Sequence, residues 1–246
     1  MFERNAADGI HRVEDAYVNW YLVEDGDRIT IVDTGHPRSW GSLREALWAL
    51  DRSPTDIEAV VLTHGHFDHV GFAERARLEL GVPVLAHREE QHTAANPWDY
   101  DHERPRAAYA RYPRFLKIFA AMGAAGALWV KGAQQVRAFE ENGKLDVPGS
   151  PELVFTPGHT YGHCALHFPE RGALISGDAL VTLDPYTGRE GPRVVARAAN
   201  ADSASALASL DALAATGAQT VLPGHGAPWR DGVEAAVERA HAAGPA

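Results

Sequence analysis

The sequence predicts an α/β protein, because short apolar strands alternate with amphipathic helices along the chain. The alternation is clearest in the last part, where a helix at 203–215 is followed by a strand at 218–222 and a helix at 231–242. Of the 246 residues, 45% are hydrophobic and 23% are charged, as in an ordinary globular domain. We therefore expect a single domain, residues 1–246, in which helices cover sheets.

The first half of the chain begins with two predicted strands, at 17–24 and 28–33, which an Asp-Gly-Asp turn joins. A helix is expected at 38–50, because leucines recur there at helical spacing. Further apolar runs predict strands at 58–62, 82–85, 152–156, 164–168 and 172–176.

The charge and hydrophobicity of the chain indicate which binding partners and which cellular location to expect. The formal net charge is −10, which would stay acidic with two divalent cations bound, so we expect no nucleic-acid partner. The longest apolar stretch, 118–130, is shorter than the roughly 20 residues that cross a bilayer, so no membrane span is expected. The charged N-terminus has no apolar segment behind it, and Cys164 is the single cysteine; both favour a cytoplasmic location.

Residues 97–137 differ from their flanks and are interpreted as a helical insertion between two strands. Three interpretations of this insertion stay open: core helices with a solvated basic face, a lid or substrate wall beside the functional site, or a homodimer contact. Gly123 and Gly126 would allow the close helix approach of a dimer. The aromatic members of the insertion are Trp98, Tyr100, Tyr109, Tyr112, Phe115, Phe119 and Trp129, and the basic ones are Arg104, Arg106, Arg111, Arg114 and Lys117.

The most informative motif is His64-Gly65-His66-Phe67-Asp68-His69, in which four side chains able to bind a divalent metal fall within six residues. It follows an apolar run, as a ligand loop follows a buried strand. On an extended segment His64 and His66 point to the same side, so one cation can take both. Asp68 and His69 lie further along and face a second position. The doubled set predicts two metal ions.

Three further donors follow apolar strands at glycine-containing loops. They are His159 in Pro157-Gly158-His159, Asp178 in Ser176-Gly177-Asp178 and His225 in Pro223-Gly224-His225. One isolated Gly-His pair would mean little. Four ligand loops, each at the end of a strand, predict one shared site.

These motifs resemble those of the metallo-β-lactamase superfamily of hydrolases. The resemblance implies a four-layer αββα sandwich with the metals at one edge, here carrying the helical insertion. It also implies that Asp33, in an early Asp-x-Gly turn, buttresses the site. The matching segments, in the family's order, are Val32-Asp33-Thr34-Gly35, Thr63-His64-Gly65-His66-Phe67-Asp68-His69, Pro157-Gly158-His159-Thr160, Gly177-Asp178 and Pro223-Gly224-His225-Gly226.

The resemblance further implies the ligand roles and the chemistry. Such nitrogen and oxygen donors suit two zinc ions, although iron or manganese bind similar sets. A hydroxide bridging the metals would attack a small ester, thioester, lactone or amide, with Asp68 as a catalytic residue that orients it or carries its proton. His64, His66 and His159 would hold the first metal, Asp68, His69 and His225 the second, and Asp178 both.

Other side chains beside the ligand loops are candidates for support or substrate contact. His36 follows the turn that contains Asp33, and Tyr161 and Tyr186 follow ligand loops, from where either hydroxyl could donate to a developing oxyanion.

Subclasses of the family differ around the shared ligand set. Glyoxalase II-type thioesterases add a C-terminal glutathione-binding extension, whereas this chain ends soon after His225. Acyl-homoserine lactone lactonases share the His-Phe-Asp-His motif but usually carry a tyrosine where this chain has Val181. The expected function is metal-dependent hydrolysis of a small substrate, in this glyoxalase II-like or lactonase-like branch. A lactonase is the leading specific alternative, and a mononuclear iron persulfide dioxygenase is the alternative from another class.

Overall fold

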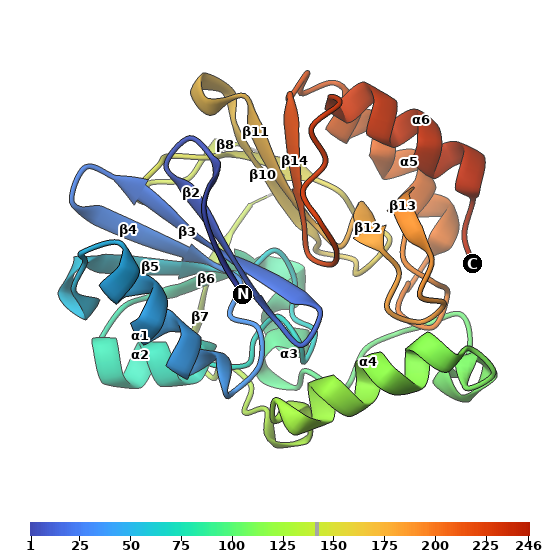
Figure 1. Cartoon of the computed structure of the whole chain (residues 1–246), viewed down its shortest axis with the longest axis horizontal. Coiled ribbons are helices and arrows are strands. Elements are labelled where there is room, and N and C mark those ends of the chain that lie inside the picture. The colour runs from blue at the N-terminus through green and yellow to red at the C-terminus, as the bar shows by residue number, and fades with distance from the viewer. Residues whose placement is uncertain (141–142) are drawn as a thin grey trace.

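The computed structural model describes residues 1–140 and 143–246, and two large β-sheets pack face to face between layers of helices (Figure 1), with β12 and β13 pairing in a small third sheet. The strands are β1 (Phe2–Ala7), β2 (Ile10–Asp15), β3 (Val18–Asp25), β4 (Arg28–Val32), β5 (Ile57–Val61), β6 (Val84–His87), β7 (Val136–Phe139), β8 (Gly143–Lys144), β9 (Glu152–Phe155), β10 (Cys164–Phe168), β11 (Ala173–Gly177), β12 (Val181–Leu183), β13 (Glu190–Arg193) and β14 (Thr220–Pro223). The α-helices are α1 (Ser39–Ala49), α2 (Ala73–Leu80), α3 (Gln91–Ala95), α4 (Pro113–Ala124), α5 (Ser203–Ala214) and α6 (Val233–Ala243), and the 3₁₀ turns are η1 (Pro54–Asp56), η2 (Arg88–Glu90), η3 (Arg106–Tyr109), η4 (Ala127–Trp129) and η5 (Pro169–Arg171).

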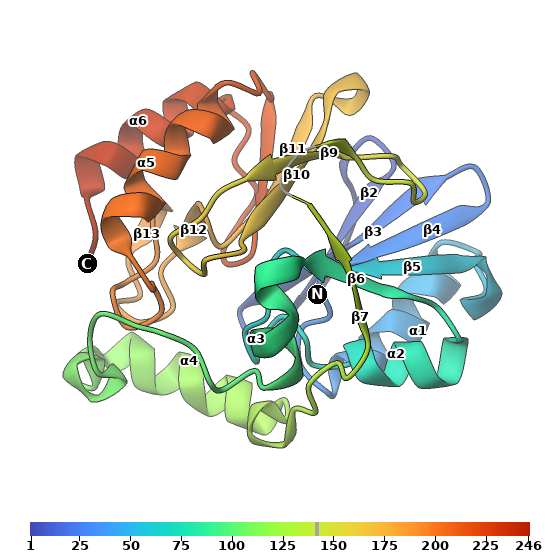
Figure 2. The ribbon, with the colours of Figure 1, turned by 180° about the vertical axis from the view of Figure 1, so that it is seen from behind.

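The seven-stranded first sheet has the order β1-β2-β3-β4-β5-β6-β7, and the five-stranded second sheet has the order β14-β11-β10-β9-β8. Neighbours from β1 to β4 are antiparallel, whereas β4 to β7 are parallel. Helices α1 and α2 cover the outer face of the first sheet, and α5 and α6 that of the second (Figures 1 and 2). The αββα sandwich expected from the resemblance is confirmed.

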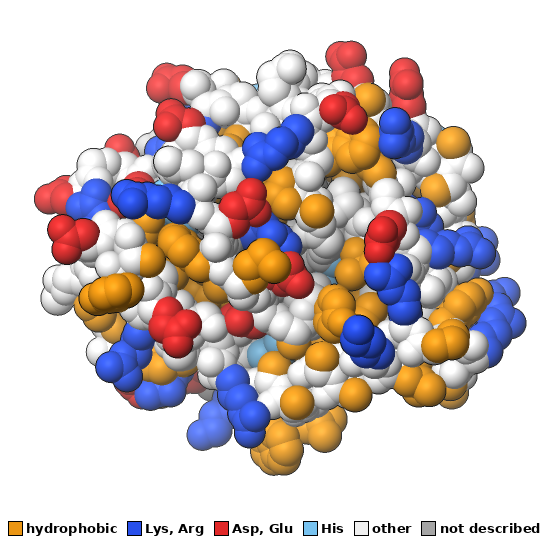
Figure 3. Space-filling view, in the orientation of Figure 1, with side chains coloured by type: hydrophobic (Ala, Val, Ile, Leu, Met, Phe, Trp, Pro, Cys, Tyr) orange, Lys and Arg blue, Asp and Glu red, His pale blue; other side chains and the backbone are white. Residues whose placement is uncertain are grey.

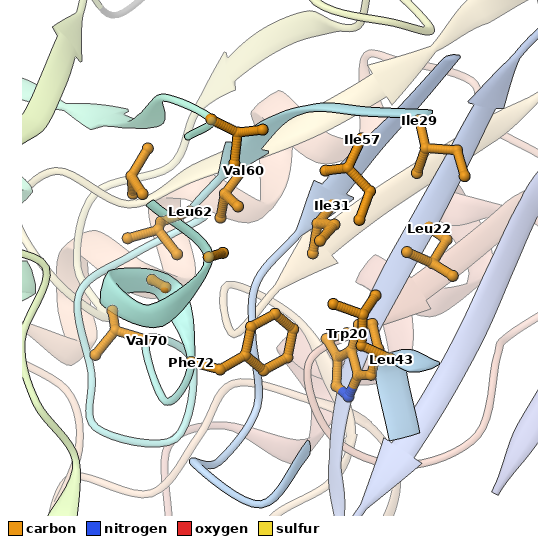
Figure 4. Close-up of a cluster of buried hydrophobic side chains, with 14 of the residues drawn as sticks. Trp20, Leu22, Ile29, Ile31, Leu43, Ile57, Val60, Leu62, Val70 and Phe72 are labelled. Carbon is orange, nitrogen blue, oxygen red and sulfur yellow. The ribbon is translucent and has the colours of Figure 1, made fainter. Parts of the chain in front are cut away.

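Apolar clusters hold the four layers together. Between the first sheet and its helices, the rings of Trp20 and Phe72 meet edge to face, with centroids 5.3 Å apart (Figure 4). Tyr21 from the first sheet and Leu166 from the second share the cluster between the sheets. Leu210 of α5 belongs to a third cluster, which seals the outer face of the second sheet.

The structure has elements that the sequence did not predict, among them β1, β2 and α2. Helix α2 buries only two alanines, Ala73 and Ala76, and leaves Leu78 66% exposed, so its apolar periodicity is weak. The strand expected at 82–85 begins later, at Val84, because Pro83 has no backbone N–H for the ladder.

The insertion predicted at 97–137 is helical only in part, over η3, α4 and η4, and its last two residues already belong to β7. Helix α4 lies beneath both halves of the sandwich in the view of Figure 1. The insertion carries exposed apolar side chains: Leu116 of α4 is 56% exposed, and Leu128 and Trp129 of η4 are 71% and 69% exposed. Apolar side chains gather over this part of the surface in Figure 3. The expected dimer contact through this surface stays a prediction. None of the helices within residues 1–140 and 143–246 has the length and apolar character that a membrane span requires.

Candidate metal centre

The predicted ligand loops leave the two sheets where strand ends converge. Strands β4 and β5 are parallel, so Asp33 and the loop at 64–69 leave the first sheet on the same side. In the second sheet β9, β11 and β14 share one direction, so the loops after them also meet. Two backbone hydrogen bonds join the edges: Cys164 N donates to Thr63 O at 3.0 Å, and Asn19 N donates to Gly224 O at 2.7 Å.

The seven donors predicted from the sequence lie together in three overlapping groups. All seven are at most 7% exposed, and within each group the candidate ligand atoms lie within 4.8 Å of one another. The groups are His64 with His66 and His159, His64 with His69 and Asp178, and Asp68 with His69 and His225.

Asp178 lies between the groups. Its Oδ2 is 3.5 Å from His159 Nε2 and 3.2 Å from His225 Nε2. Its Oδ1 is 3.7 Å from His69 Nε2. One carboxylate thus reaches donors of both predicted metal positions.

The donor atoms themselves show that the cluster fits cations. Unpaired buried polar atoms cost about 1–3 kcal/mol each, so a group of them that converges points to a binding partner. Nitrogen and oxygen at this spacing are the donors that zinc, iron and manganese take. Among the described residues, no hydrogen-bond partner reaches the buried Nε2 atoms of His64, His66, His69 and His159, or Oδ1 of Asp178.

Two of the histidine rings are held in place through Nδ1, the ring nitrogen that faces away from the donor cluster. His159 Nδ1 lies 3.0 Å from the side-chain oxygen of Asn200, and His225 Nδ1 lies 2.8 Å from the carbonyl oxygen of Tyr17. Since these oxygens only accept, each ring carries a proton on Nδ1 and turns Nε2 toward the cluster.

Asp33 plays the same part for His69. Its Oδ2 accepts from His69 Nδ1 at 2.9 Å and from the Thr63 hydroxyl at 2.8 Å, and its Oδ1 accepts from Thr63 N at 2.8 Å. Thr63 Oγ1 in turn lies 3.0 Å from His64 Nδ1. This geometry supports the buttressing role that the resemblance implies for Asp33.

Electrostatics divide the cluster into two kinds of donor. Burial, reinforced by neighbouring imidazoles, holds the pKa values of His64 and His66 well below the usual range, so both rings are neutral and ready to bind a cation. Burial also opposes the charge of His69, but the carboxylates of Asp178 and Asp33 outweigh it and raise the pKa of His69 to about 10. Burial likewise opposes ionisation of Asp178, yet the charges of His225 and His69 hold its pKa well below the usual range.

The three remaining candidates lie in different places. His36 is fully buried, and burial, with the charges of His69 and His225, lowers its pKa to about 4. Tyr186 is buried, and its ring is 5.3 Å from that of Phe119. Tyr161 is 55% exposed and lines a cavity of about 320 Å³ whose lining, among the described residues, includes none of the seven donors.

The start of the insertion packs on the ligand loop. The Tyr100 ring lies 3.8 Å from the His66 ring, and the Trp98 ring is stacked on Phe67 at 3.9 Å. The Arg106 guanidinium lies over both aromatic rings, 4.7 Å from that of Tyr100 and 5.3 Å from that of Trp98. The start of the insertion therefore borders the candidate centre, and its role as core, lid or dimer contact stays a prediction.

Sequence analysis did not single out several residues that hold the cluster. His163 Nε2 accepts from Asp178 N at 3.1 Å, and its Nδ1 lies 2.8 Å from Thr156 Oγ1. The sequence feature that could have pointed to His163 is its position four residues after His159. Asn200 and Glu90 reach the ligand loops from distant segments, for which the sequence holds no signal.

Comparison with known proteins agrees with this geometry. The family described as the metallo-beta-lactamase superfamily matches residues 13–225, and the chain belongs to it. "Probable metallo-hydrolase YflN" of Bacillus subtilis (strain 168) is 26% identical over 235 residues, which cover 91% of this chain and 86% of that protein. The crystal structure of metallo-beta-lactamase family protein TTHA1429 from Thermus thermophilus has a TM-score of 0.68 at 28% identity, covering 94% of this chain and 78% of the other. TTHA1623 in a di-iron-bound form has a TM-score of 0.61 at 27% identity and covers 91% of this chain and 95% of the other.

Proposed function

We propose that this chain is a two-metal hydrolase that cleaves small esters, thioesters or lactones. The observation that carries the proposal is the position of Asp178, with one oxygen 3.5 Å from His159 Nε2 and 3.2 Å from His225 Nε2. A carboxylate so placed suits a pair of cations rather than a single one. The B. subtilis relative described as a probable metallo-hydrolase supports a hydrolytic reaction.

The residues of the candidate centre would have three roles: binding the cations, orienting the histidine rings and accepting a proton. When bound, two divalent cations supply Lewis acidity and lower the pKa of water toward neutrality. Asp33, Asn200 and the Tyr17 carbonyl hold the histidine rings so that the Nε2 lone pairs converge. Asp68, whose Oδ2 lies 3.5 Å from His225 Nε2, would accept the proton of the attacking water. The first position would be held by His64, His66 and His159, the second by Asp68, His69 and His225, and Asp178 would belong to both.

The aromatic contacts favour a small substrate with an apolar acyl part. Trp98 and Tyr100 pack on the ligand loop, and behind them lie Phe115 and Tyr186, with ring centroids 5.8 Å apart. Lactones with an acyl chain are the leading specific substrates. Val181, which replaces the tyrosine usual in lactonases, is buried in β12.

The test is metal-dependent turnover. Metal-free protein is loaded with zinc, iron or manganese and assayed on lactones, esters and thioesters, while bound metal is counted by mass spectrometry. We expect two zinc ions per chain and hydrolysis that needs both. Asp178→Ala should lose metal and at least about 10²–10³-fold of the rate, whereas Asp211→Ala, at an exposed side chain of α5, should lose neither. One iron per chain with oxygen consumption on a persulfide would contradict the proposal and favour a dioxygenase.

A further inference from the structure

Glu90 is a buried carboxylate that links two ligand loops. It lies in η2, just after β6, and is 1% exposed. Its Oε2 accepts a hydrogen bond from Gly65 N at 2.7 Å, and its Oε1 accepts one from Gly162 N at 2.9 Å. Gly65 stands between His64 and His66, and Gly162 follows His159 by three residues. One side chain therefore holds the backbone on both sides of the first donor group.

The two glycines that bond to Glu90 are closely surrounded by other atoms. A Cβ atom at Gly65 would lie 2.5 Å from the backbone nitrogen of Ala94, and one at Gly162 would lie 2.8 Å from Glu90 Oε1. Both distances are below any normal contact. At Gly65 the obstacle is backbone, so only glycine lets this loop approach the segment that carries Glu90, whereas at Gly162 the obstacle is the Glu90 carboxylate itself.

The two loops belong to different sheets. The loop with Gly65 follows β5 of the first sheet, and Gly162 precedes β10 of the second. The ring of His159 lies 4.6 Å from that of His66 and 4.7 Å from that of His64. A change in the distance between the loops would therefore move His159 Nε2 relative to the Nε2 atoms of His64 and His66.

We propose that Glu90 is a positioning residue, which sets the spacing of the first metal group, His64 with His66 and His159. The role rests on the proposed metal centre, but it involves no contact with substrate or with the reacting atoms. It predicts that loss of the carboxylate weakens the first metal position selectively, because the second group, Asp68 with His69 and His225, has no bond to Glu90 among those that the structure describes.

Glu90→Gln is the decisive variant. A side-chain amide has one oxygen, so its NH₂ group would face a backbone N–H and one of the two bonds would be lost. Each metal position is measured alone by disabling the other. His225→Ala removes a ligand of the second position and leaves the first to be measured, and His66→Ala removes a ligand of the first and leaves the second. Metal-free protein is titrated with zinc by calorimetry and with cobalt by absorption. We expect Glu90→Gln to weaken the first position about 10–100-fold and to leave the second unchanged.

Glu89→Gln is the matched control, since it removes the same charge from the neighbouring, exposed side chain. Equal weakening in both backgrounds, as a purely structural loss would give, overturns the proposal, and so does unchanged binding in both. If Glu90→Gln fails to fold, Glu90→Asp serves instead: its shorter side chain cannot span both N–H groups, and the same selective weakening is expected. No substrate is involved, so failure of the hydrolysis proposal leaves this result intact, whereas a wild-type protein that binds no metal refutes both.

Discussion

The ring of Tyr100 lies over the ring of His66, with the centroids 3.8 Å apart and the planes at 34°. Tyr100 comes from the insertion and His66 from the ligand loop, so this pair joins the insertion to the candidate metal centre. Burial raises the pKa of Tyr100 to about 12. Tyr100 thus closes the donor cluster on the side of His66.

Trp98→Ala should alter substrate preference and leave metal binding intact. The indole stacks on Phe67 and lies under Arg106, and among the described residues no ring contact joins it to a predicted ligand. An aromatic pair contributes about 0.5–1.5 kcal/mol, so KM for acyl substrates should change roughly two- to tenfold. Trp48→Ala, at a site 85% exposed on α1, is the control and should change nothing. Loss of metal with unchanged preference would contradict a lid.

Asp33→Asn should weaken the second metal position by about 10–100-fold, because the amide would turn a donor toward His69 Nδ1 and release the ring. Asparagine tolerates the positive φ of 58° at this position, so the backbone is not strained. Asp51→Asn is matched, since Asp51 also has φ of 58° but is exposed after α1. Equal metal affinity in the two variants, measured by competitive chelation, would rule out the buttress.

His11 should make the metal-free protein less stable in mild acid. Its Nδ1 accepts from Asn5 N at 3.0 Å and its Nε2 lies 2.7 Å from Glu24 Oε2, so the neutral ring is already fully bonded. Burial, the main cause, lowers the pKa of His11 below 6.5. Between that lowered value and 6.5 the unfolded chain binds more protons, so stability is present above pH 6.5 and is lost as the pH falls.

Chemical unfolding of metal-free protein at about pH 7.5 and about pH 5.5, on either side of the usual histidine pKa, measures this loss. His11→Gln cannot titrate and should lose less stability than the wild type over that interval. His92→Gln, at a side chain 67% exposed, should keep the wild-type dependence. Parallel behaviour of the wild type and His11→Gln would refute the assignment.

Phe72→Ala should remove about 3–5 kcal/mol from the free energy of unfolding. The Phe72 ring is 1% exposed and meets the rings of Trp20 and Trp40 edge to face, at 5.3 and 5.7 Å. Leu78→Ala, on the exposed side of α2, should cost less than about 0.5 kcal/mol. Similar losses in both variants, in urea titrations, would show that this cluster does not hold α2 and the first sheet together.

The parts of the fold that could be predicted are those that a short stretch of sequence determines by itself. An apolar run ending in a glycine-containing loop marks Asp178 and His225 at the ends of β11 and β14, since a buried strand must be continuous and apolar. The helix expected at 203–215 is α5, and the structure adds a cap that the prediction did not use: Asp202 accepts from Ala204 N and Ser205 N.

Other parts depend on distant contacts and leave no local trace. Strand β1 contains Asn5 at a positive φ of 53° and takes its place by pairing with β2, so its own residues carry little strand signal. Glu90 stands 25 residues from Gly65 and 72 from Gly162 along the chain, and no spacing rule connects them. The pairing of Tyr100 with His66 depends likewise on how the insertion folds back.

The division of the donors between the sheets has a consequence for biosynthesis. A nascent chain that has emerged only as far as β7 already displays His64, His66, Asp68 and His69, yet neither cation position is complete before His159, Asp178 and His225 follow. Each of the three donor groups takes one member from a loop of the second sheet, so neither sheet alone carries a complete group. The metal centre that we propose would therefore form only after the strands of the second sheet have been translated.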